Sequence, residues 1–125
     1  MKETNRKMRV IVARPGKPAE VTDINADYDI LEEIVGGELE FHTPVMNDVV
    51  VTCDKYGKVK GKMPNRFLFG SLSVPFIKEG HEVDAFAGTI VIFGHRKGRV
   101  MLDSLTDSEV DLYMDIYGEP EFVTD

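Results

Sequence analysis

Short runs of apolar and β-branched residues, separated by turn residues, dominate the hydrophobic pattern of the chain. Residues 8–13 form the first run, and Pro15-Gly16 behind it lets residues 19–23 return beside it as a hairpin. Residues 89–93 are continuously apolar over the length of a strand. We therefore predict that they form a central strand.

Residues 38–43 and 48–53 have the same β-like character and are separated by Pro44 and Asn47. A turn after the second run leads into Lys58–Lys60, which predicts a meander of three strands. Residues 61–82 contain two prolines and no clear period, so the pattern leaves this excursion unplaced.

Two amphipathic stretches predict helices near residues 26–35 and 106–117. Asn25 is expected to cap the first helix, and Thr106 with Glu109 forms a capping box for the second. The predicted fold class is therefore α+β: a mixed, mainly antiparallel sheet packed with two short helices.

The length of 125 residues and a hydrophobic fraction of 42% suit one core. We expect a flexible N-terminus over residues 1–7, a single α+β domain over 8–117 and a C-terminal tail over 118–125. No apolar run approaches the roughly 18 residues of a membrane-spanning helix. The lone Cys53 cannot form an intramolecular disulfide, which favours the reducing cytoplasm.

The net charge of −7 argues against general nucleic-acid binding, and the charges are segregated. Residues 18–54 and 100–125 contain no lysine or arginine. The basic residues gather in three stretches, over 6–17, 55–66 and 96–99. These stretches would form one basic region if the fold brings them together; solvated faces are the simpler interpretation.

Neither metal nor nucleophilic chemistry is predicted. His42, His81 and His95 lack the spacing that places metal ligands together. Cys53 ends an apolar β-like run, where cysteine is more often a small buried hydrophobe than a reactive thiolate. We therefore predict no catalytic residue, no metal site and no cofactor.

Acidic residues recur every four positions near the end of the chain, at Asp103, Asp107, Asp111 and Asp115. On a helix this spacing would align the carboxylates about 6 Å apart along one face. The stripe is either a solvated helix face or an acidic surface that imitates a phosphate backbone and binds a basic groove on a protein partner.

The segment from Lys58 to Arg66 combines basic residues with Gly61 and Asn65. Glycine permits close approach of the backbone, asparagine can donate and accept, and arginine offers a planar fork suited to phosphate or carboxylate. The segment is therefore either an anion-binding loop or a solvated one.

Five motifs occur in order: Val35-Gly-Gly-Glu-Leu-Glu40, Cys53-Asp-Lys-Tyr-Gly-Lys58, Gly61 followed by Pro64-Asn65-Arg66, Ala87-Gly88-Thr89 after Asp84, and Ser104-Leu-Thr-Asp107. Together they resemble a family of small domains of unknown function from phages, prophages and conjugative elements of Gram-positive bacteria. The resemblance covers roughly positions 8 to 117.

The resemblance implies a mobile-element setting, in which small proteins often counter host defence by binding rather than by catalysis. It leads to the hypothesis of a non-enzymatic accessory protein that binds an anionic, nucleotide-like ligand. The candidate ligand-binding residues are Asn65, Arg66, Phe86 and Thr89, with Phe86 as a stacking surface. The alternative is an acidic inhibitor of a host defence protein, acting through its C-terminal helix. The apolar Phe67–Phe69 patch further predicts a homo-oligomer.

Overall fold

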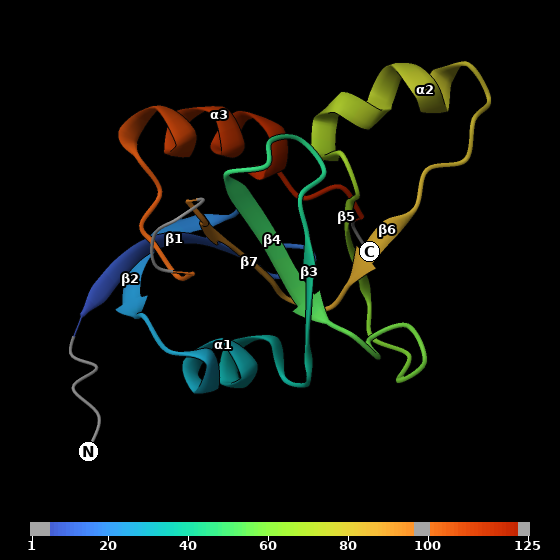
Figure 1. Cartoon of the computed structure of the whole chain (residues 1–125). Coiled ribbons are helices and arrows are strands. Elements are labelled where there is room, and N and C mark those ends of the chain that lie inside the picture. The colour runs from blue at the N-terminus through green and yellow to red at the C-terminus, as the bar shows by residue number, and fades with distance from the viewer. Residues whose placement is uncertain (1–5, 97–100, 123–125) are drawn as a thin grey trace.

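The computed structural model describes residues 6–96 and 101–122 and confirms the α+β class (Figure 1). Its elements are, in chain order, β1 (Lys7–Ala13), β2 (Glu20–Asn25), α1 (Tyr28–Val35), β3 (Leu39–His42), β4 (Val49–Asp54), β5 (Pro64–Phe67), a 3-10 helix η1 (Gly70–Ser73), α2 (Val74–Lys78), β6 (Ala85–Ala87), β7 (Ile90–Gly94) and α3 (Asp107–Tyr117).

The larger sheet has five strands in the order β2-β1-β7-β4-β3, and every neighbouring pair is antiparallel. The expected hairpin is confirmed as β1 and β2, and the run at 89–93 is confirmed as the central strand β7. Strands β5 and β6 form a second, two-stranded antiparallel sheet. Because β6 leads almost directly into β7, the small sheet stays close to the large one.

Helices cover both faces of the large sheet, α1 on one side and α3 on the other (Figure 1). The side chains of β1 contribute alternately to the apolar cores on the two faces of the sheet, because successive strand residues point to opposite faces. Val10 belongs to the apolar cluster of Leu31 in α1, whereas Ile11 belongs to that of Tyr113 in α3. Burial on both faces explains why the central strands are continuously apolar.

The capping box of α3 is confirmed: the Thr106 side chain accepts from the Glu109 N–H, and the Glu109 side chain accepts from the Thr106 N–H. The predicted cap of α1 is wrong. Asn25 is the last residue of β2, and Asp27 is the cap, accepting from the Asp29 N–H.

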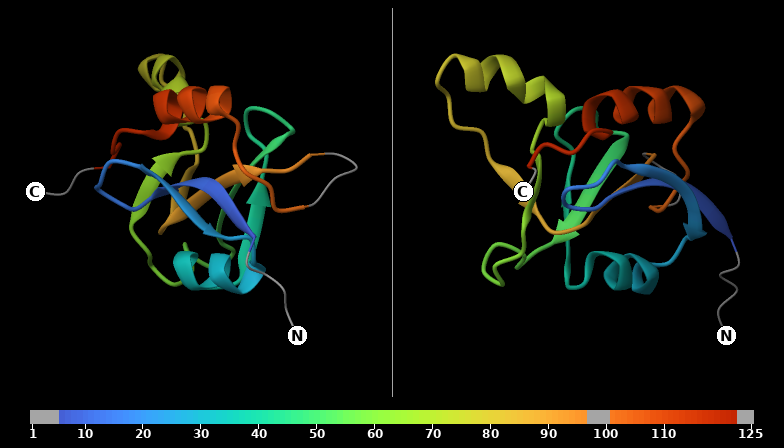
Figure 2. Two further views of the ribbon diagram at one scale, coloured as in Figure 1. Left: turned by 90° about the vertical axis from the view of Figure 1, so that its left-hand side faces the viewer. Right: turned by 180° about the vertical axis from the view of Figure 1, so that it is seen from behind.

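The excursion over residues 61–82 contains elements that the pattern did not place, namely β5, η1 and α2. Lys58–Lys60 lies in a turn and does not form the predicted third strand of the meander. No residue of α2 is buried, and the helix stands away from the large sheet (Figure 2). Its apolar side chains therefore remain exposed.

Residues 118–122, expected to belong to a tail, contact the domain. The Gly118 carbonyl accepts from the Ala19 N–H, and the Phe122 ring lies 4.7 Å from that of Phe67 between centroids. Most of the predicted N-terminal segment, residues 1–5, lies outside the described residues. Within the part of the chain that the structure describes, no helix is both long and apolar enough to cross a lipid bilayer.

Candidate functional site

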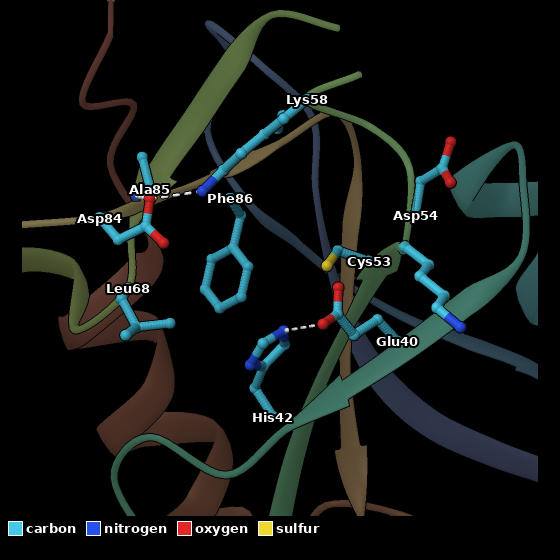
Figure 3. A pocket seen from close by; sticks show the side chains of 11 residues that line it. Glu40, His42, Cys53, Asp54, Lys58, Leu68, Asp84, Ala85 and Phe86 are labelled. Atoms are coloured by element: carbon cyan, nitrogen blue, oxygen red, sulfur yellow. Dashed lines mark hydrogen bonds and ion pairs between the residues drawn. The ribbon is translucent and has the colours of Figure 1, made fainter. Parts of the chain in front are cut away.

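A pocket of about 150 Å³ lies between the two sheets, where β3 and β4 of the large sheet face β6 of the small one (Figure 3). We call it the inter-sheet pocket. It is lined by Glu40, His42, Cys53, Asp54, Lys55, Lys58, Leu68, Asp84, Ala85, Phe86 and Ala87.

Strand geometry brings Glu40, His42 and Cys53 to one wall of the pocket. Glu40 and His42 are two residues apart on β3, so their side chains share a face. Glu40 lies opposite Cys53 in the β3–β4 register. As a result, one potential ligand atom from each of the three side chains lies within 4.8 Å of the others. The His42 Nε2 and Glu40 Oε2 atoms are 3.8 Å apart.

The lysines around the pocket already have carboxylate partners. Lys58 donates to Asp84 on the side formed by the small sheet (Figure 3). Asp54 is buried and accepts from Lys60 at 2.8 Å, and Lys62 lies 2.8 Å from the same oxygen. Glu40 pairs only with a histidine within the described residues, so its charge is the least compensated at the pocket.

The Cys53 thiol is not activated by its surroundings. Burial, together with the negative charges of Glu40 and Asp54, raises its pKa to about 11, against a smaller lowering by Lys58. The thiol therefore stays protonated near neutral pH, whereas nucleophilic cysteines need a lowered pKa.

Phe86, which the sequence suggested as a stacking surface for a ligand, lines the pocket, although the residue is mostly buried. The His42 ring meets it edge-on, with 5.4 Å between centroids. A more open hollow of about 450 Å³ adjoins the pocket and shares Leu68 and Asp84 with it. Phe76 of α2 is among the residues that line this outer hollow.

Asn65, predicted to contact a ligand, is instead fully buried. Its side-chain amide donates to the carbonyls of Ala13 at 2.8 Å and Gly88 at 2.9 Å, and thereby joins β1 to the turn before β7. Its amide oxygen accepts from Arg66 at 2.7 Å.

Arg66 is fully buried as well. Its guanidinium donates to the carbonyls of Tyr117 at 2.8 Å and Lys17 at 2.7 Å. Burial lowers the pKa of Arg66, while the nearby charges of Glu121 and Glu119 raise it. Asn65 and Arg66, which we call the arginine cluster, thus connect three distant segments and present no surface to a ligand in solution.

Thr89 is half-buried between β6 and β7 and does not line the inter-sheet pocket. The four predicted ligand-binding residues therefore do not form one site. Of the described residues of the basic stretches, Arg66 is buried and Arg96 binds Glu109 at 2.7 Å, so neither offers its charge to a shared basic site. Lys97 and Arg99 lie outside the described residues.

The acidic stripe is shorter than its spacing suggests. Asp103 precedes α3, bridges to Gly94 and lies 4.0 Å from Arg96. Asp107 is the first residue of α3 and lies 2.8 Å from the Arg9 guanidinium. Asp111 and Asp115 are exposed on the helix.

Sequence reasoning missed Glu40 and His42 as site residues and treated Cys53 as inert. Along the chain, no pair of histidines has ligand spacing. The available signal was the Glu40-x-His42 alternation in a β-like run facing a second run that ends in Cys53. That signal needs the strand register, which only the structure supplies.

Comparison with known proteins identifies a family but no described function. No curated protein and no solved structure matches the chain. Residues 8–118 match a protein family described as a domain of unknown function, DUF3846. These residues contain every strand that forms the inter-sheet pocket and both helices that cover the large sheet. The chain therefore belongs to the DUF3846 family of domains of unknown function.

Proposed function

We propose that this protein is a non-enzymatic binding protein that holds an anionic, nucleotide-like ligand in the inter-sheet pocket. One observation carries the proposal: a single pocket combines the Phe86 ring with hydrogen-bonding groups of both charges, among them Glu40 and Lys58. Ligand pockets commonly join an apolar wall to a few polar groups in this way.

The size of the pocket restricts how such a ligand would sit. Pockets for drug-sized molecules occupy roughly 300–1,000 Å³, whereas the inter-sheet pocket has about 150 Å³. It suits one part of a nucleotide, and the outer hollow beside it suits the remainder. A base edge would donate to Glu40, and Lys58 and Lys55 would exchange their carboxylate partners, Asp84 and Glu38, for phosphate.

The high pKa of Cys53 supports binding rather than catalysis. A thiol with a pKa of about 11 supplies little thiolate at neutral pH, so the pocket lacks an activated nucleophile of this kind. The distance between His42 Nε2 and Glu40 Oε2 is 3.8 Å, which is longer than a hydrogen bond. The two side chains therefore do not form the hydrogen-bonded pair that a general base with an orienting carboxylate would need.

Calorimetric titration with a panel of linear and cyclic nucleotides, in buffer containing a metal chelator, tests the proposal. Lys58→Ala should weaken binding by about 1.5–3 kcal/mol, the contribution of a charge-assisted hydrogen bond. Lys17→Ala is the matched control, because this exposed lysine does not line the pocket. No heat from any nucleotide, or equal affinity of the wild type and Lys58→Ala, would contradict the proposal.

A second candidate is an acidic inhibitor that binds a basic groove on a host protein through α3. The exposure of Asp111 and Asp115 favours it. Asp111→Lys with Asp115→Lys should then abolish capture of the partner, whereas Lys58→Ala should have no effect. The reverse pattern would reject the acidic inhibitor.

The proposed setting is the cytoplasm of a host cell, where the protein would act as an anti-defence accessory of a phage or mobile element.

We also propose self-association through the exposed apolar side chains of η1, α2 and the residue before them. They are Phe69, Leu72, Val74, Phe76 and Ile77. Light scattering that gives 14.0 kDa across a wide concentration range would contradict self-association.

A further inference from the structure

The side-chain group of Glu40, His42 and Cys53 offers one oxygen, one nitrogen and one sulfur donor on one wall of the inter-sheet pocket. Figure 3 shows the Glu40 carboxylate between the Cys53 sulfur and the His42 ring. We propose that these three residues bind a zinc ion whose fourth coordination position faces the pocket. This inference goes beyond the ligand proposal and does not depend on it.

The donor set fits zinc better than magnesium or calcium. Zinc is a borderline-soft ion that binds thiolate, imidazole and carboxylate, whereas magnesium and calcium take oxygen ligands. Sites with three protein ligands keep one position for water or a bound molecule. Here that position would face Phe86 and Leu68, which line the same pocket.

The distances require only a small contraction. Zinc bond lengths of about 2.0–2.3 Å place tetrahedral ligand atoms roughly 3.3–3.6 Å apart. The present atoms all lie within 4.8 Å of one another, and His42 Nε2 is 3.8 Å from Glu40 Oε2. The side chains of Glu40 and His42 are 45% and 33% exposed, so both can rotate toward the buried Cys53.

The surrounding charges favour a cation at this point. The negative charges of Glu40 and Asp54, which raise the pKa of Cys53, also attract a metal ion. Asp54 is held by Lys60 and Lys62 and does not compete as a ligand. The ammonium group of Lys58 is held by Asp84, and its effect on Cys53 is smaller than that of Glu40 or Asp54. Glu40 is left as the available carboxylate.

Binding exchanges the thiol proton of Cys53 for the metal. The S–H bond breaks, the sulfur electron pair binds zinc, and the proton passes to the buffer. With one thiolate, one carboxylate and neutral His42 as ligands, the ion and its ligands carry no net charge. A neutral site costs little to bury beside the sheet.

Competition titration of the untagged protein against a chromophoric zinc chelator, without nucleotide, tests the site. We expect one zinc ion per chain. Cys53→Ser and His42→Gln should each lower the zinc affinity by more than about 100-fold, because losing a residue that only hydrogen-bonds to a metal ligand already costs about 10- to 100-fold, and these variants lose a ligand itself. Cobalt should produce a thiolate charge-transfer band that Cys53→Ser removes.

His81→Gln is the matched control. His81 also faces a carboxylate, with its Nε2 3.6 Å from Glu79 Oε1, but no cysteine joins this pair in the described structure. Its zinc affinity should equal that of the wild type. If Cys53→Ser fails to fold, Glu40→Gln and His42→Gln on the exposed edge strand carry the test. Absence of stoichiometric zinc binding, a cobalt spectrum without the thiolate band, or equal losses in His42→Gln and His81→Gln would overturn the site.

Discussion

The arginine cluster and the inter-sheet pocket contain similar kinds of side chains and use them in opposite ways. In the arginine cluster, the donors of Asn65 and Arg66 reach carbonyls of the same chain, and both residues are fully buried. In the pocket, Glu40 and His42 are partly exposed and lie beside a cavity. A polar residue is available for function only where the main chain has not already used its hydrogen-bonding capacity.

From this contrast we propose that one region serves stability and the other serves binding. Arg66 links β5 to the end of α3 and to the turn after β1 through two backbone carbonyls. The pocket residues come from the edge strand β3, from its neighbour β4, and from β6 and the segments near it. Variants of the two regions should therefore separate loss of folding from loss of binding.

Arg66→Met should give the largest loss of stability. It removes a buried donor group and leaves the Tyr117 and Lys17 carbonyls and the Asn65 amide oxygen without their partner. We expect a loss of about 3–5 kcal/mol in the free energy of unfolding, measured by urea denaturation. The matched control is Arg14→Met, an exposed arginine in the β1–β2 turn. A loss below 1 kcal/mol would show that Arg66 is free for another role.

Asp54→Asn should have an intermediate effect that depends on pH. Burial alone raises the pKa of the Asp54 carboxyl, but hydrogen bonds from Lys60, Lys62 and the Tyr56 N–H outweigh it and hold the pKa below its usual range. A lowered folded-state pKa stabilises the protein above the unfolded pKa of about 3.9 and loses this contribution as pH falls.

The wild type should therefore be more stable than Asp54→Asn by about 1–3 kcal/mol at pH 7. The difference should shrink as the pH falls below about 4. Urea denaturation of both proteins at several pH values measures it. A difference that stays constant down to pH 2 would contradict the role of the ionised carboxylate.

His42→Gln should have the smallest effect on folding. Its side chain is partly exposed on an edge strand, so we expect a change within about 0.5 kcal/mol in the free energy of unfolding. Thermal and urea denaturation without metal measure this change. A loss of 2 kcal/mol or more in the free energy of unfolding would show that His42 has a structural role.

Most of the fold could be predicted from the sequence because its signals are local. The apolar runs of β1, β4 and β7 and the capping box of α3 depend on neighbouring residues. The segment at 61–82 could not be placed, since α2 has only five residues, nearly all apolar, and none of them is buried, so the sequence shows no amphipathic period there.

The site depended on contacts that local patterns do not encode. Arg66 resembled an anion-binding residue, but its partners Tyr117 and Lys17 lie 51 and 49 positions away. Conversely, Glu40 and Cys53 become neighbours only once the β3–β4 register is fixed. Hydrogen-bond partners and strand register are tertiary properties, so local patterns show neither the buried partners of Arg66 nor the position of Glu40 beside Cys53.

Amide and side-chain NMR shifts of the labelled protein, followed through titration with zinc and then with the nucleotide panel, test the division between the two regions most directly. The account predicts shifts centred on β3, β4 and β6, at His42, Cys53 and Phe86, with Asn65 and Arg66 unchanged. Shifts centred on Asn65 and Arg66, or no shift in the inter-sheet pocket with any addition, would contradict it.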